Sequence, residues 1–79
     1  METQIAIADT GFVVALLNQR DNRHLDVVPI YTQRSQIILP QTVLAEVAYL
    51  LGRDAGIITV AAFLRGISAS RFRLTAIAS

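Results

Sequence analysis

Apolar and polar positions along the chain form blocks that predict strands separated by helices. Residues 5–8 are an uninterrupted apolar run, which is typical of a strand buried on both faces. A turn signal, Asp-Thr-Gly, follows at residues 9–11. Residues 12–18 predict a short helix and residues 18–23 a polar loop.

The next helix is predicted from His24 to about Ser35, because apolar side chains recur there at helical spacing. Asp21 or Asn22 is expected to cap its first turn. Pro29 lies inside the segment, and proline is tolerated only in the first turn of a helix. We therefore expect this helix to begin later or to kink.

Two further strands and two further helices complete the pattern. Residues 37–39 form an apolar strand that Pro40 closes, and an apolar stripe over residues 43–51 predicts a helix ended by a following glycine. Residues 57–68 repeat the helical spacing, and residues 72–75 alternate like a strand. Strands that alternate with helices indicate an α/β fold with a parallel sheet.

Composition makes the chain more apolar than its size suggests. Of its 79 residues, 53% are hydrophobic and 16% charged, against about 45–50% and about 25% in an ordinary soluble domain. A chain this short buries only ~60% of the surface that its unfolded form exposes. We expect a single domain over residues 1–79 that buries apolar surface against a partner or is part of a larger fold. Ser79 would suit the N-cap of a further helix.

Charge and cysteine content exclude several classes of protein. The net charge is +1 and there is no lysine, so no global field indicates nucleic-acid binding. Without cysteine the chain has no disulfide or thiolate metal site. Glu2 and Asp9 lie where a signal peptide would be basic and then apolar, and no apolar run reaches the roughly 18 residues of a membrane span. We expect a soluble, cytoplasmic chain with no membrane partner.

Two carboxylates are the candidates for chemistry. Asp9 ends a predicted strand, and open α/β sheets bind ligands at the carboxyl ends of their strands; the alternative is that Asp9 only caps the next helix. Glu46 is predicted on or beside the buried stripe of its helix, with no basic residue three or four positions away. Desolvating it unpaired would cost several kcal/mol, unless it reaches solvent at the edge of the stripe. An arginine, a raised pKa or a cation would compensate.

Asp9 follows the first predicted strand and Glu46 lies in the helix after the second, so the two carboxylates are expected on adjacent strand ends, where a cation could lie between them. At ~4 Å and an effective dielectric constant of about 20, two like charges repel by about 4 kcal/mol. Mg²⁺ and Mn²⁺ prefer carboxylate oxygens, retain water ligands, polarise phosphodiesters and activate water. Asp9 and Glu46 therefore predict a Mg²⁺ or Mn²⁺ site. The single histidine, His24, is expected to be a surface or capping group. Arg53, Arg65, Arg71 and Arg73 could touch phosphates, but we expect a solvated face and strand-edge gatekeepers.

Two known families share motifs with the chain. Apolar-Asp-Thr-Gly is the signature of aspartic proteases, but those are nearly all β, and this chain has helical stripes and no hairpin signal. The motifs resemble the PIN-domain family, the VapC-like toxin ribonucleases, in its N-terminal part. The matching segments are Asp9-Thr10-Gly11 with the apolar residues 12–18, Asp21-x-x-His24, residues 38–40, 43–47 and 50–53, the Phe63-Leu64 helix and the Phe72–Leu74 strand.

The resemblance implies a three-layer α/β/α fold with a short parallel sheet, here incomplete at the C-terminus, with about three strands and four helices. It implies Mg²⁺- or Mn²⁺-dependent cleavage of single-stranded RNA, an antitoxin partner and dimers. Asp9 and Glu46 would be the metal carboxylates, and the hydroxyl of Thr10 would lie near the metal as a third catalytic group. The family's further acidic residues would come after Ser79.

Two functions remain open from the sequence. The first is a PIN-like ribonuclease of the toxin–antitoxin type, with weak or no activity in this short chain because its metal shell is incomplete. The second is a non-catalytic interaction module that forms homo-oligomers. The two hypotheses share a fold and differ in whether the metal site works.

Overall fold

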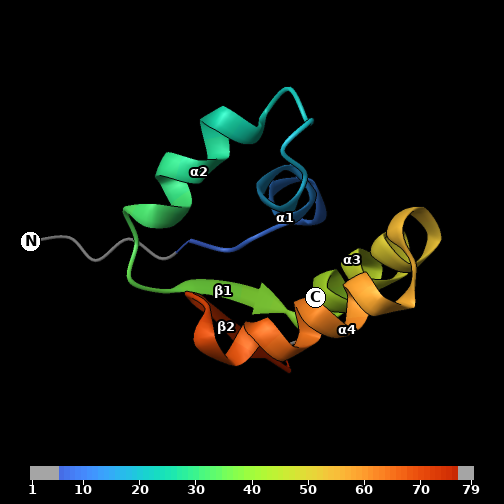
Figure 1. The fold of residues 1–79 in the computed structure, drawn as a ribbon. Helices are drawn as coiled ribbons and strands as arrows, with labels where there is room; N and C mark the ends of the chain where they lie inside the picture. The colour runs from blue at the N-terminus through green and yellow to red at the C-terminus, as the bar shows by residue number, and fades with distance from the viewer. Residues whose placement is uncertain (1–5, 77–79) are drawn as a thin grey trace, which may run out of the picture.

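The structure is a computed structural model that describes residues 6–76. Four α-helices and a short parallel sheet confirm the predicted α/β fold (Figure 1). Glu2, residue 5 as the start of the first predicted strand, and Ser79 as a possible helix N-cap lie outside the described residues. The elements are α1 (Thr10–Leu17), α2 (His24–Thr32), β1 (Ile37–Pro40), α3 (Gln41–Ala55), α4 (Ile57–Gly66), the 3₁₀ helix η1 (Ile67–Ala69) and β2 (Phe72–Thr75).

The sheet aligns the carboxyl ends of its strands at one edge. β1 and β2 run parallel, with Pro40 opposite Thr75 at that edge. The segment before α1 joins the other side of β1 through one parallel bridge, between Ile7 and Ile38. Two backbone hydrogen bonds hold the segment there. The N–H of Ile38 donates to the carbonyl of Ala6, and the carbonyl of Ile38 accepts from the N–H of Ala8. The chain therefore leaves this segment for α1 at the same edge where β1 and β2 end.

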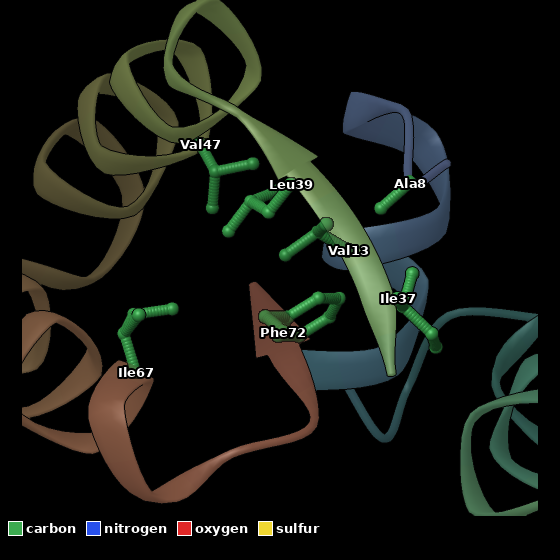
Figure 2. Close-up of a cluster of buried hydrophobic side chains, with 7 residues drawn as sticks. All are labelled: Ala8, Val13, Ile37, Leu39, Val47, Ile67 and Phe72. Carbon is green, nitrogen blue, oxygen red and sulfur yellow. The ribbon is translucent and has the colours of Figure 1, made fainter. Parts of the chain in front are cut away.

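The sheet buries one of its faces. Ala8, Leu39 and Phe72 are buried among the helices, as Figure 2 shows, whereas Ile7 is 65% exposed and Arg73 is also exposed. The prediction of a first strand buried on both faces is therefore wrong at Ile7. Val13 of α1 and Val47 of α3 lie in the same buried cluster as Leu39 and Phe72, so both helical connections pack helices against this face.

The start of α2 differs from the sequence prediction in two respects. Arg23 is the N-cap of α2 and makes no capping side-chain bond, so the prediction of Asp21 or Asn22 is wrong. Pro29 lies inside α2, which nevertheless begins at His24, so proline does not delay its start. α3 ends as predicted at a glycine: Gly56 has a φ of 90°, a conformation that other residues rarely adopt.

A set of polar and aromatic contacts fixes α2 against β2. The backbone N–H of Arg71 donates to the hydroxyl of Tyr31 at 2.9 Å, and its guanidinium donates to the carbonyl of Arg34 at 2.7 Å. The guanidinium also lies over the Tyr31 ring, 5.7 Å from its centre, and the ring contacts Phe72. Arg71 thus connects the end of the α2 segment to the start of β2.

Within residues 6–76, no helix is long and apolar enough to cross a membrane.

Candidate functional site

Asp9 lies at the sheet edge where the strands end, and it caps α1. Its backbone is extended, and its Oδ1 accepts a hydrogen bond from the N–H of Phe12 at 2.8 Å. The capping role that the sequence left open is therefore present. The carboxylate remains exposed to solvent, so capping leaves it accessible to a ligand.

Thr10 and Glu46 meet across the interface between α1 and α3. The hydroxyl of Thr10 donates to Oε1 of Glu46 at 2.5 Å. Thr10 is the first residue of α1, directly after Asp9, and Glu46 lies in the second turn of α3. Two of the three residues predicted as a site are thus in direct contact, and the third is their neighbour in sequence.

Glu46 is more accessible than the sequence indicated. We expected a partly desolvated carboxylate beside the apolar stripe of its helix. Glu46 is instead exposed, and the next residue of α3, Val47, is the one that is buried. The expected desolvation is therefore wrong, and the alternative of a carboxylate at the solvent edge of the stripe holds. Its polar partner is Thr10 and not an arginine.

The donor set around Asp9 suits a hard cation. Carboxylate oxygens of Asp9 and Glu46 and the hydroxyl of Thr10 are oxygen donors, and Mg²⁺ commonly binds one or two carboxylates while keeping several waters. Among the side chains of residues 6–76, no group of three His, Cys, Asp or Glu residues could enclose a metal. A cation bound by Asp9 and Glu46 would therefore keep waters at its remaining positions.

Arg23 is the residue that the sequence analysis missed. Its Nη2 donates to the carbonyl of Gly11 at 3.4 Å, which brings the guanidinium to the first turn of α1. Asp21 holds the same side chain, because its Oδ1 accepts from the backbone N–H of Arg23 at 2.8 Å and from its Nε at 3.3 Å. Both hydrogen bonds lower the pKa of Asp21, and the bond from the backbone N–H has the larger effect. The Asp-x-Arg spacing in a loop is the signal that could have indicated it.

His24 has a structural contact. Its Nδ1 lies 2.8 Å from the carbonyl oxygen of Ala15, and because a carbonyl only accepts, this nitrogen carries the proton. The bond joins the start of α2 to the last turn of α1. The Asp21-x-x-His24 motif therefore fixes the loop on which Arg23 lies.

A large hollow lies away from the candidate site. It has a volume of about 620 Å³ and is lined by residues of β2, η1 and neighbouring segments, including Arg71 and Arg73. None of the three predicted site residues lines it. An exposed metal site needs no deep cavity, so the chemistry of the donors identifies the candidate site better than volume does.

Comparison with known proteins supports the fold. No family model matches the chain, and no curated protein matches it. A solved structure does: the Mycobacterium tuberculosis toxin VapC20, described as a sarcin–ricin loop cleaving toxin, is 29% identical with a TM-score of 0.71. The match covers 92% of this chain and 58% of that toxin, so the chain spans less than two thirds of its length. The chain resembles the VapC-like PIN-domain family, as its motifs predicted.

Proposed function

We propose that the chain is a PIN-like ribonuclease domain that hydrolyses single-stranded RNA with Mg²⁺ or Mn²⁺. The observation that carries this proposal is the Thr10–Glu46 hydrogen bond beside Asp9, at the edge of the sheet where the strands end. The likeness to a toxin described as cleaving the sarcin–ricin loop supports the substrate class. The chain's position in a toxin–antitoxin pair, with an antitoxin protein as partner, is part of the same proposal, as is a cytoplasmic location.

Asp9 and Glu46 would hold the cation, and Thr10 acts on Glu46. When bound, the cation polarises the phosphodiester and activates water. The N–H of Phe12 fixes one oxygen of Asp9, and the Thr10 hydroxyl fixes one oxygen of Glu46. Each carboxylate is thereby held in one orientation with its other oxygen available. Holding ligands in place before the cation arrives reduces the entropy lost on binding.

Thermal unfolding with and without Mn²⁺ tests the site, using the Asp9→Asn variant. Asparagine caps helices as well as aspartate does, so this variant keeps the cap and loses the charge. A cation at ten times its dissociation constant would add about 1.4 kcal/mol to the free energy of unfolding, which raises the melting temperature of a domain this size by several degrees. Asp54→Asn is the control, because Asp54 is an exposed aspartate paired with Arg53 on the far part of α3.

We expect the wild type and Asp54→Asn to gain stability with Mn²⁺ and Asp9→Asn to gain none. A ribonuclease assay with Mn²⁺ on single-stranded RNA then tests the activity itself, with the same three proteins. Cleavage by the wild type that survives in Asp9→Asn, or no cleavage by the wild type at any Mn²⁺ concentration, would contradict the proposal.

The second candidate is a non-catalytic interaction module that forms homo-oligomers. Ile7 is 65% exposed on the open face of the sheet, and Leu25 and Ile58 on the helices are more than 80% exposed, at 82% and 81%. Exposed apolar side chains in such number favour burial against another molecule. A monodisperse monomer in light scattering, over a wide range of concentrations, would argue against this candidate.

A further inference from the structure

We propose that Arg23 binds a backbone phosphate of the RNA beside Asp9. This inference rests on the proposed function for its substrate class. It names a contact residue outside the predicted set of Asp9, Thr10 and Glu46.

Two anchors hold the guanidinium in place. Oδ1 of Asp21 accepts from Nε of Arg23 at 3.3 Å, and the carbonyl of Gly11 accepts from Nη2 at 3.4 Å. The backbone N–H of Arg23 also donates to the same carboxylate oxygen, so the loop and the side chain are fixed together. An arginine that is already oriented loses less conformational entropy when it binds a ligand.

Gly11 brings this guanidinium close to the carboxylate of Asp9. A side-chain carbon at Gly11 would lie 3.1 Å from Nη1 of Arg23 and 3.7 Å from Oδ1 of Asp9. Both charged groups therefore lie within 4 Å of one point above the first turn of α1. Because Gly11 has no side chain, the guanidinium of Arg23 and the carboxylate of Asp9 can both lie beside this point.

The anchors leave most of the guanidinium available. Arginine has five N–H donors in a fork, and the two anchoring bonds use one each on Nε and Nη2. The side chain is 56% exposed, so its remaining donors can reach a ligand in solution. Three N–H groups in one plane match the oxygens of a phosphate, and the positive charge is permanent.

A positive charge at this place would offset the repulsion between RNA and the candidate site when no cation is bound. Asp9 and Glu46 are both acidic and exposed, and two carboxylates repel a phosphate backbone. The chain contains no lysine, so its positively charged side chains at neutral pH are arginines. Arg23 is the arginine that the structure places against the first turn of α1. Contact between Arg23 and a phosphate would orient the RNA over the candidate metal site.

RNA binding in EDTA tests this contact without any cleavage. The probe is a short fluorescein-labelled single-stranded RNA, and fluorescence anisotropy gives its affinity at several salt concentrations. Arg23→Gln removes the charge, and Arg53→Gln is a closely matched control. Arg53 is also paired with an aspartate and is 58% exposed, but it lies at the end of α3 away from the site.

We expect Arg23→Gln to weaken RNA binding roughly tenfold at low salt, the effect of one charged hydrogen bond. The slope of log K against log salt should fall by about 0.7, the value for one phosphate on a single strand. Arg53→Gln should match the wild type in both. Arg23→Lys keeps the charge and loses the fork, so it should keep the slope and lose part of the affinity; it also serves as the test if Arg23→Gln does not fold.

Equal affinities and slopes for Arg23→Gln and the wild type would overturn the inference, as would a wild type that binds no RNA in EDTA. A separate cleavage assay in Mn²⁺ distinguishes this failure from failure of the proposed function. If the wild type cleaves RNA while Arg23→Gln binds like the wild type, only the role of Arg23 is wrong. If the wild type binds RNA through Arg23 but cleaves none, only the ribonuclease activity is wrong.

Discussion

Thr10 and Glu46, 36 residues apart in sequence, are joined by a hydrogen bond of 2.5 Å between a hydroxyl and a carboxylate oxygen. The bond connects the first residue of α1 to the second turn of α3, and α1 begins where the segment before it reaches the edge of the sheet. It therefore sets where Glu46 lies relative to Asp9. A bond to a charged acceptor is also stronger than one between neutral groups.

Thr10→Val should weaken Mn²⁺ binding by releasing Glu46. The exposed carboxylate would then sample several rotamers, and we expect the thermal shift with Mn²⁺ to fall while the fold persists. Loss of the bond itself should cost about 1 kcal/mol or less in the free energy of unfolding. Thr10→Ser keeps the hydroxyl and should keep the metal response.

Thr42→Val is the control for the general effect of valine on a helix. Thr42 is exposed on α3, one turn before Glu46. The measurement is calorimetric titration with Mn²⁺ for all four proteins. If Thr10→Val binds Mn²⁺ as the wild type does, then Thr10 does not position Glu46.

Asp9→Ala should separate the capping role of Asp9 from its charge. Alanine cannot accept the N–H of Phe12, so α1 loses its side-chain cap, at a cost of about 1 kcal/mol in the free energy of unfolding. Asp9→Asn should unfold within a few tenths of a kcal/mol of the wild type, because asparagine caps equally well. Urea unfolding without metal measures both. Equal stability of the alanine and asparagine variants would show that the cap contributes nothing.

The sequence predicted the α/β order well because each element depends on local patterns. The stripe on α3 and the glycine after it are visible without any tertiary information, and Gly56 does end that helix. The cap of α2 was missed for a local reason as well. Asp21 uses its side chain to hold the Arg23 backbone and its carbonyl to hold the backbone of His24, and sequence alone does not indicate which group a loop aspartate contacts.

The sequence proposed the members of the candidate site, which stay a prediction, but it could not give their contacts. Motif resemblance brought Asp9, Thr10 and Glu46 together, but the bond between the last two depends on how α1 packs on α3. The exposure of Glu46 depends on the same packing, which turns Val47 inward and leaves its neighbour in solvent. Arg23 was missed because its approach to Gly11 spans 12 residues of loop and helix.

Two glycines should respond oppositely to alanine. Gly56 has a φ of 90°, so Gly56→Ala forces a side chain into a conformation it rarely adopts, and we expect a loss of about 1 kcal/mol. Gly66 is helical, with a φ of −79°, and a Cβ there would meet nothing within 4 Å. Gly66→Ala should therefore raise the free energy of unfolding by about 0.4–1 kcal/mol. Chemical unfolding of both variants checks the pair, and a stabilising Gly56→Ala would contradict the backbone assignment between α3 and α4.

Asp21 should make the stability of the protein depend on pH in the acid range. The hydrogen bonds from Arg23 lower the pKa of Asp21 in the folded state, so folding favours its charged form. A carboxyl of this kind stabilises the protein above its unfolded pKa, and that contribution is lost as the pH falls through its folded pKa. Asp21→Asn should therefore be less stable than the wild type at neutral pH, and the difference should shrink as the pH falls below the ordinary range of a carboxyl group and Asp21 becomes protonated. Thermal unfolding across this range measures it, and a difference that does not change with pH would show that the charge of Asp21 does not hold Arg23 in place.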